Sequence, residues 1–169
     1  MHASSVEAIA DALSRANVRY LVVGGLAVVA HGHLRFTADI DIVLDLKRSN
    51  VEAAMTALAA LGYRPRAPVA LAEFADPAMR ASWAREKGLR VFSLWSALYP
   101  ATEIDIFVEE PFDFTETYRR ADLVEILPSL TLPVVAIDDL LALKRAAGRP
   151  VDLEDVRALD ALRRDRGED

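Results

Sequence analysis

Three aspartates in two apolar stretches are the residues of this sequence best suited to chemistry. Asp39 and Asp41 alternate with isoleucines in the run Asp-Ile-Asp-Ile, and Asp105 stands between Ile104 and Ile106. Because successive side chains of a strand point to opposite faces, Asp39 and Asp41 are expected side by side on one face. Like charges held together destabilise each other, and a divalent cation would relieve that conflict. If the strand of Asp105 lies beside the first, three carboxylates meet.

The ligand types narrow the choice of metal. Carboxylate oxygens suit the hard cations Mg²⁺ and Mn²⁺, which keep several waters and take phosphate oxygens as further ligands. The sequence has no cysteine, so thiolate sites and disulfides are excluded, and these ligands do not favour zinc. We therefore expect Mg²⁺ or Mn²⁺ on Asp39, Asp41 and Asp105.

Gly24 and Gly25 are candidates for phosphate binding. They follow a short apolar run over 18–23 and precede a second apolar run over 26–30. A strand that enters two glycines and then a helix lets the backbone approach an anion closely. A triphosphate placed there would share its oxygens with metal on the aspartates. A hydroxyl near Asp105 would then attack the α-phosphorus, with pyrophosphate as the leaving group.

The elements that must position these residues alternate between helical and strand patterns. The last third is helical, and the segment 64–87 reads as loop with one short helix near 79–85. Asn50 is expected to cap a helix that Gly62 ends. The expected strands lie at 18–23, 39–46, 89–94, 103–108 and 123–126. This order predicts an α/β (α+β) fold with a central mixed sheet of about four to five strands, flanked by helices and followed by C-terminal helices.

Length and composition favour one folded domain. The chain has 169 residues, of which 53% are hydrophobic and 27% charged, values typical of a globular protein. We expect a single domain over 1–165 and a frayed tail over 166–169. The net charge of -6 argues against broad adhesion to nucleic acid. The sequence shows neither a secretory signal pattern nor an apolar run long enough to span a membrane, so cytoplasmic residence is the default expectation.

Two motifs together carry a family resemblance. Gly24-Gly25 is followed by Arg35-x-Thr37-x-Asp39-x-Asp41 and by the lone Asp105, a series that resembles the nucleotidyltransferase superfamily. It is most similar to the minimal nucleotidyltransferases of bacterial toxin–antitoxin and abortive-infection systems (AbiEii-like). A late basic and acidic pattern strengthens this resemblance and consists of Asp139, Leu140, Lys144, Arg149, Asp152 and Asp155. The resemblance covers most of the chain except 64–87.

The resemblance implies an activity and a set of roles. The implied reaction transfers a nucleoside monophosphate from a nucleoside triphosphate such as ATP to a hydroxyl or similar acceptor. Asp39, Asp41 and Asp105 would bind metal and carry catalysis. The implied nucleotide and phosphate contacts are Gly24, Gly25, Arg35, Thr37 and Lys144.

The residues leave other interpretations open for part of this set. Many superfamily members have Gly-Ser where this chain has Gly24-Gly25, so a hydroxyl contact is missing. Arg35 could equally pair with a carboxylate, and Thr37 could simply begin a strand. Asp152 and Asp155 are interpreted as a helix N-cap and its first-turn companion.

Acceptor and partner stay open as well. The acceptor could be transfer RNA, a protein or a small molecule such as an antibiotic, and a toxin would have a cognate antitoxin protein. One alternative is an inactive nucleotide-binding or antitoxin-like module of the same fold. A lesser alternative is a haloacid-dehalogenase-like phosphatase, because Asp39-Ile-Asp41-Ile-Val also satisfies an Asp-x-Asp-x-Val pattern.

Overall fold

The computed structural model describes residues 1–165 and 167. The predicted frayed tail, 166–169, therefore falls almost entirely outside the described residues. The helices are α1 (Ala3–Arg15), α2 (Gly24–Ala30), α3 (Arg48–Ala60), the 3-10 helix η1 (Leu71–Ala75), α4 (Pro77–Lys87), α5 (Phe114–Arg119), α6 (Ile137–Ala147) and α7 (Pro150–Asp165). The strands are β1 (Tyr20–Val23), β2 (Asp39–Leu44), β3 (Tyr63–Pro65), β4 (Val91–Ser96), β5 (Glu103–Phe107), β6 (Asp122–Leu127) and β7 (Leu130–Val134).

The strands form one mixed sheet in the order β3-β4-β5-β2-β1-β7-β6. Two of the neighbouring pairs are parallel, β2 with β5 and β1 with β7, and the other pairs are antiparallel. The predicted mixed α/β architecture is confirmed, but the sheet has seven strands rather than four or five. The strands that the sequence analysis missed are β3 and β7.

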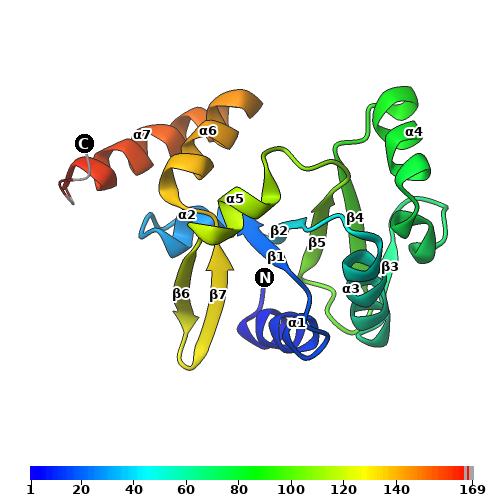
Figure 1. Cartoon of the computed structure of the whole chain (residues 1–169). Coiled ribbons are helices and arrows are strands. Elements are labelled where there is room, and N and C mark those ends of the chain that lie inside the picture. The colour runs from blue at the N-terminus through cyan, green and yellow to red at the C-terminus, as the bar shows by residue number, and fades with distance from the viewer. Residues whose placement is uncertain (166, 168–169) are drawn as a thin grey trace.

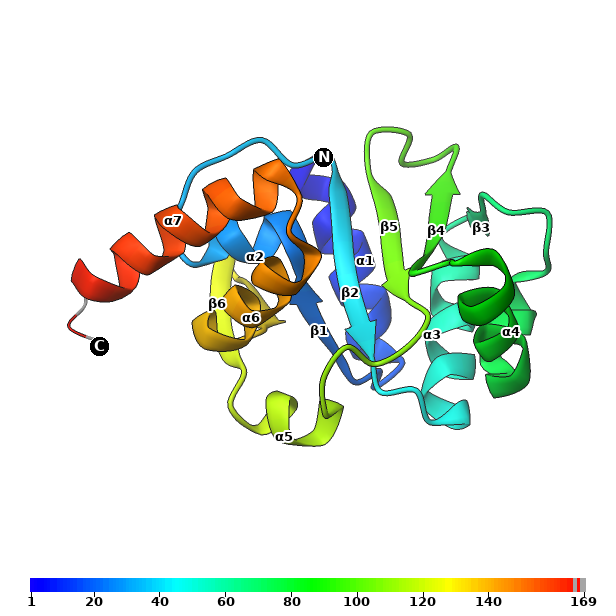
Figure 2. The same cartoon turned by 90° about the horizontal axis from the view of Figure 1, so that it is seen from above.

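Helices cover the two faces of the sheet unequally (Figure 1). Helices α1 and α3 pack together beneath it, while α2, α6 and α7 lie on the other side, over the β1–β7 end. Seen from above, β2, β5 and β4 are not covered by any helix (Figure 2). Side chains on that uncovered surface can therefore reach a ligand.

Strand β2 shows why the two faces differ. Ile40 and Ile42 are buried, whereas the alternating Asp39 and Asp41 are only partly so. The isoleucines belong to one large apolar cluster that includes Leu13 of α1 and other buried side chains. Burial of this apolar area favours folding and fixes which way the strand faces, since a shift by one residue would send the aspartates into the core.

The segment 64–87 is more ordered than its sequence indicates. It contains η1 and α4, whose aromatic side chains Phe74 and Trp83 stack with Phe92 of β4 at centroid distances of 4.9 and 5.3 Å. Asp76 caps α4 by accepting a hydrogen bond from the backbone of Ala78. The short helix expected near 79–85 is therefore confirmed and is longer than predicted.

Asn50 does not cap α3, contrary to the prediction. That helix begins at Arg48, and the Asn50 side chain instead joins three backbone groups. It accepts from the Arg19 N–H at 2.8 Å and donates to the carbonyls of Arg19 and Asp45 at 3.0 and 2.8 Å. Its amide thus fastens the end of β2 to the segment before β1.

None of the helices in the described part of the chain is both long and apolar enough to span a membrane.

Candidate active site

Strand register brings the three predicted aspartates together. In the parallel pair β2–β5, Asp41 stands opposite Asp105, and Asp39 lies two residues earlier on the same face of β2. All three line one pocket of about 380 Å³, a volume within the usual range for a small-molecule site. The carboxyl of Asp105 therefore lies on the same side of the sheet as the other two.

The surroundings of Asp41 and Asp105 oppose the ionisation of these two carboxyls. Burial raises the pKa of Asp41 above its ordinary value, and the negative charge of Asp105 raises it further, against a hydrogen bond from the Gly25 N–H. Burial also raises the pKa of Asp105, where a hydrogen bond from Ser93 works in the opposite direction and the charges of Asp39 and Glu103 add to the rise. A cation bound between them would remove the repulsion.

Both glycines are required by what packs against them. A Cβ on Gly24 would lie 1.8 Å from Oδ2 of Asp41, and a Cβ on Gly25 would lie 2.6 Å from Oγ1 of Thr37. Gly24 also has a φ of +63°, which favours glycine. The turn is therefore shaped around Asp41 and Thr37. Because the Gly25 N–H is directed at the Asp41 carboxylate, this donor is already engaged in the absence of a phosphate.

The donor set fits a hard divalent cation by its chemistry. The three groups are carboxylates on one face of adjacent strands, and carboxylates with phosphate oxygens are the usual ligands of Mg²⁺. Across residues 1–165 and 167, however, no three histidine, cysteine or acidic side chains are already arranged as a metal-ligand cluster. The Asp41 carboxylate accepts a hydrogen bond from the Gly25 N–H, and the Asp105 carboxylate accepts one from the Ser93 hydroxyl. Binding of a metal by both carboxylates would therefore draw them toward each other.

Lys144 lines the pocket, but its ammonium is already paired. It lies 3.1 Å from Oδ1 of Asp152 and 2.7 Å from Oδ2 of Asp155, and its side chain is only 5% exposed. The sequence analysis expected this lysine to reach nucleotide phosphates or the acceptor. In the structure it is instead paired with these two buried aspartates of α7.

The same two aspartates hold two arginines at the pocket. Nη1 of Arg35 lies 2.7 Å from Asp155, and Nε of Arg149 lies 2.7 Å from Asp152. Burial tends to raise the pKa of Asp152, but hydrogen bonds from Arg149 and Lys144 outweigh it and leave that pKa below its ordinary value. We call Arg35, Lys144, Arg149, Asp152 and Asp155 the α6–α7 charge cluster. It holds three cations and two carboxylates.

The sequence analysis named the members of the α6–α7 charge cluster, and the pairing of Arg35 with a carboxylate was one of its open interpretations. It missed that Asp152 and Asp155 are buried and hold the three cations. It interpreted Asp152 and Asp155 as an N-cap and its companion, yet α7 begins at Pro150 and both carboxylates are buried. One signal was available: Asp152, Asp155 and Leu159 recur at helical spacing, so the period that buries Leu159 buries the aspartates too. Buried carboxylates require cationic partners.

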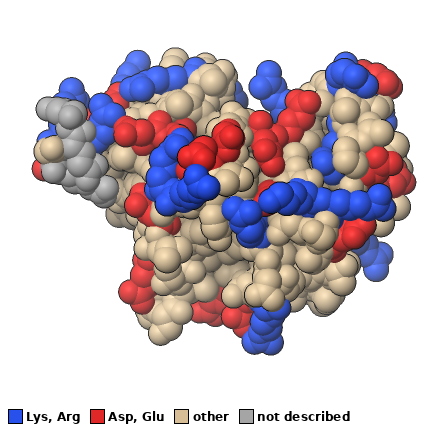
Figure 3. All heavy atoms as spheres, viewed as in Figure 1, with Lys and Arg blue, Asp and Glu red and all other residues tan. Residues whose placement is uncertain are grey.

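Thr37 and the surrounding surface complete the site. The Thr37 hydroxyl donates to the carbonyl of Asp39 at 3.2 Å, which fixes the entry into β2. Acidic and basic side chains lie beside one another in the middle of the face seen in Figure 3. The pocket therefore combines carboxylates of β2 and β5 with three cations: Lys144 of α6, Arg149 between α6 and α7, and Arg35 before β2.

Comparison with protein families gives a match over nearly the whole chain. Residues 3–164 match the family described as "Nucleotidyltransferase of unknown function (DUF6036)", and the chain belongs to this family. No curated protein matches the sequence.

Solved structures share the fold at low sequence identity. The lincosamide antibiotic adenylyltransferase LnuA, bound to lincomycin, is 17% identical with a TM-score of 0.64, and the match covers 96% of this chain and 98% of that one. A putative nucleotidyltransferase from Thermotoga maritima is 16% identical with a TM-score of 0.56, covering 92% and 89%. The antibiotic-resistance factor ANT(2'')-Ia is 16% identical with a TM-score of 0.53, covering 95% and 90%. At these identities the likeness establishes the fold, which is that of nucleotidyltransferases.

Proposed function

We propose that this member of a nucleotidyltransferase family transfers a nucleoside monophosphate from a nucleoside triphosphate to a hydroxyl acceptor, with residues 1–165 acting as one domain. The observation that carries the proposal is the placement of Asp39, Asp41 and Asp105 on one sheet face within one pocket. Their charges repel, which suits a divalent cation, and the family match supports the class of reaction. The haloacid-dehalogenase-like alternative has no support from the family or the fold.

Asp39, Asp41 and Asp105 would hold Mg²⁺ or Mn²⁺. When bound, the metal neutralises charge on the phosphate oxygens and on the departing pyrophosphate. Asp105 has a second role in this proposal. The acceptor oxygen forms a bond to the α-phosphorus as the bond to the β-phosphate oxygen breaks, and the hydroxyl proton passes to Asp105. Asp105 is the base of this proposal because its carboxylate shares the sheet face and the pocket of Asp39 and Asp41.

The α6–α7 charge cluster supplies positive charge for the triphosphate. Arg35 and Arg149 line the pocket and are held in place by buried aspartates, so they need no ordering when an anion arrives. Lys144 adds to the positive potential of the pocket and lies within electrostatic range of Asp41. Gly24, Gly25 and Thr37 also line the pocket and would contact the phosphates.

A small hydroxyl-bearing molecule is the acceptor that we favour. The structures of LnuA with lincomycin and of ANT(2'')-Ia concern enzymes of antibiotic resistance with this fold. The net charge of -6 and the acidic side of the pocket disfavour a polyanionic acceptor such as transfer RNA. A toxin role, with transfer RNA or a protein as acceptor and an antitoxin as partner, is a separate outcome of the same experiment.

The test is a transfer assay with each α-labelled nucleoside triphosphate, Mg²⁺ and a cell extract, with Asp39→Ala as the control. Label in the small-molecule fraction supports the favoured acceptor, and label on RNA or protein supports the toxin role instead. Nucleotide-dependent thermal stabilisation without any transfer would identify an inactive binding module. Failure of the wild-type chain to transfer label or to bind any nucleotide would overturn the proposal.

A further inference from the structure

Part of the pocket lining is apolar, and we call this part the apolar end. Phe36, Leu143, Ala147 and Val151 line it, from the segment before β2, from α6 and from the start of α7. These side chains are apolar, and Leu143, Ala147 and Val151 come from α6 and α7, which lie on the β1–β7 side of β2 (Figure 2). One pocket thus joins a site for charge to an apolar surface.

Phe36 is the unusual member of this end. Its side chain is 84% exposed, although it lies in a segment that is fastened on both sides. The preceding Arg35 bonds to Asp155 at 2.7 Å and donates from Nε to the Phe36 carbonyl at 3.3 Å. The following Thr37 bonds to the Asp39 carbonyl at 3.2 Å. A phenyl ring is therefore held at the rim of the pocket without being covered by the protein.

Leu34 provides an internal comparison. It is 86% exposed in the same segment, yet it does not line the pocket. The alternation that turns Arg35 and Thr37 inward leaves both Leu34 and Phe36 outward. Of the two, only Phe36 lines the pocket that also holds Asp39 and Asp41.

The position of Asp105 fixes the direction of that ligand. Asp105 lies on β5, whereas α6 and α7 lie at the opposite, β1–β7 side of β2. An acceptor hydroxyl next to Asp105 occupies the β5 side of the phosphates. The nucleoside part of the triphosphate must then extend away from β5, toward Phe36 and Val151.

We propose that the apolar end is the nucleobase subsite and that the base stacks on Phe36, with Val151 and Leu143 covering its edge. This inference rests on the proposed nucleotidyltransferase function. Aromatic rings bind any base through its π-face, without reading its hydrogen-bonding edge. Among the described residues lining this end, the polar neighbours Arg35 and Arg149 are already bonded to aspartates. The site therefore selects weakly among bases, with purines bound tightest because they stack over the largest area.

The experiment compares direct binding of five probes to the full chain by isothermal titration calorimetry with Mg²⁺. The probes are ATP, GTP, CTP, UTP and inorganic tripolyphosphate, which has no base. The variants are Phe36→Ala, Phe36→Tyr and the matched control Leu34→Ala, whose folding is compared by circular dichroism.

We expect the four nucleotides to bind the wild-type chain with Kd values within about tenfold of one another. Phe36→Ala is expected to raise the Kd of ATP and GTP about tenfold and to leave the Kd of tripolyphosphate unchanged. Phe36→Tyr and Leu34→Ala are expected to bind all probes as the wild type does.

Three results would overturn the inference. Equal nucleotide affinities in Phe36→Ala and Leu34→Ala would remove Phe36 from the base subsite while leaving the proposed function intact. An equal loss for tripolyphosphate and ATP would show that Phe36 acts on the phosphate end. Absence of binding of any probe to the wild-type chain would overturn the inference and the proposed function together.

Discussion

The charged residues at the pocket fall into two groups: the carboxylates of strands β2 and β5, and the α6–α7 charge cluster. Asp39, Asp41 and Asp105 form no salt bridge with any lysine or arginine in the described chain. Asp152 and Asp155 are more deeply buried, and each is paired with two cations. The two groups therefore differ in charge balance rather than in burial alone.

The pKa directions express the same difference. Burial and neighbouring carboxylates raise the pKa of Asp41, whereas burial at Asp152 is outweighed by hydrogen bonds from Arg149 and Lys144 that lower its pKa. Within the described part of the pocket, Asp39, Asp41 and Asp105 have no salt-bridge partner, whereas Asp152 and Asp155 are each paired with two cations. A metal and a triphosphate would supply the missing partners of the three carboxylates. Buried carboxylates with cationic partners, here called balanced, stabilise the fold. Carboxylates without such partners, here called unbalanced, indicate a ligand site.

Removing a balanced carboxylate should have the largest effect on stability. Asp155→Ala leaves Lys144 buried with one partner fewer and frees Arg35, and losing one partner of a buried pair costs about 3–5 kcal/mol. The measurement is urea unfolding at pH 7. The matched control is Asp160→Ala, which removes an ion pair of 2.9 Å between the same helices that is 53% and 30% exposed, with an expected cost of about 0–1 kcal/mol. Equal losses of unfolding free energy in Asp155→Ala and Asp160→Ala would contradict the difference between the buried and the exposed ion pairs.

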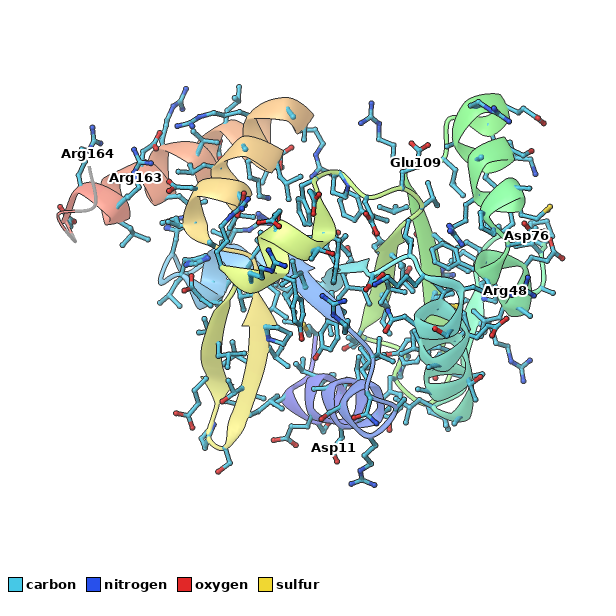
Figure 4. The ribbon with its side chains drawn as sticks, viewed as in Figure 1. Asp11, Arg48, Asp76, Glu109, Arg163 and Arg164 are labelled. Carbon is cyan, nitrogen blue, oxygen red and sulfur yellow. The ribbon has the colours of Figure 1, made fainter. Side chains whose placement is uncertain are left out.

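Removing an unbalanced carboxylate should affect transfer instead. Asp41→Asn keeps an oxygen that can accept from the Gly25 N–H but loses the charge that would hold a metal. We expect transfer to fall at least about 100-fold, equivalent to about 2.7 kcal/mol, with no loss of folding stability by circular dichroism. Asp11 points away from the sheet on α1 (Figure 4), so Asp11→Asn is the control and should transfer normally. Transfer by Asp41→Asn at the wild-type rate would contradict the proposed chemistry.

The fit between Gly24 and Asp41 can be tested separately. Gly24→Ala meets a φ of +63° and a carboxylate oxygen 1.8 Å from the new Cβ, so it should cost about 2–3 kcal/mol and impair transfer. Gly88→Ala has nearly the same φ, +61°, with no atom within 4 Å of its Cβ, and should cost about 1 kcal/mol. Thermal unfolding of both variants isolates the contribution of Asp41. Identical losses would show that only the backbone angle matters.

The smallest expected effect is on the pH dependence of stability in EDTA. A raised folded-state pKa means that the folded chain holds its proton more tightly than the unfolded chain. Ionisation of Asp41 and Asp105 therefore lowers stability as pH rises above about 4. Asp152, with its lowered pKa, stabilises the fold at neutral pH, and that contribution is lost as pH falls through its folded-state pKa.

The two groups should thus respond to pH with opposite signs. Denaturant unfolding between pH 3 and 8 should show a shallower decline above about pH 4 in Asp41→Asn than in the wild type, since each group contributes at most about 1.4 kcal/mol per pH unit. Asp152→Asn should lose most stability at pH 7 and little in acid. A steeper decline in Asp41→Asn than in the wild type would contradict a raised folded-state pKa of Asp41.

Much of the sheet side could be predicted from local pattern. Alternation alone places Asp39 and Asp41 on one face, and Asp105 repeats the same pattern. Their exact register, Asp41 opposite Asp105, depends on pairing between strands far apart in the sequence. The missed strands have a local cause: β3 is three residues long and ends in proline, and β7 contains Pro133, which cannot donate to a ladder.

The α6–α7 charge cluster was harder to predict because its pairs are tertiary. A lysine on the apolar face of α6 is equally consistent with a side chain that reaches phosphate and with one that neutralises a buried acid. The choice depends on how α7 packs against α6, which the helical period of either segment does not specify. Outer pairs of the same helices, such as Arg163 with Asp138 near the end of α7 (Figure 4), carry no such ambiguity because they are partly exposed.

The contact between Arg35 and Asp155 also has a consequence for biosynthesis, because 120 positions separate its two partners. At about 5–20 residues per second, the ribosome needs roughly 6–24 s to pass from one to the other. During that interval β2, which carries Asp39 and Asp41, has been synthesised, but α7 has not. The pocket is therefore complete only after α7 has been synthesised, and a ligand that needs both the aspartates of β2 and the cations held by α7 can bind only from that point on.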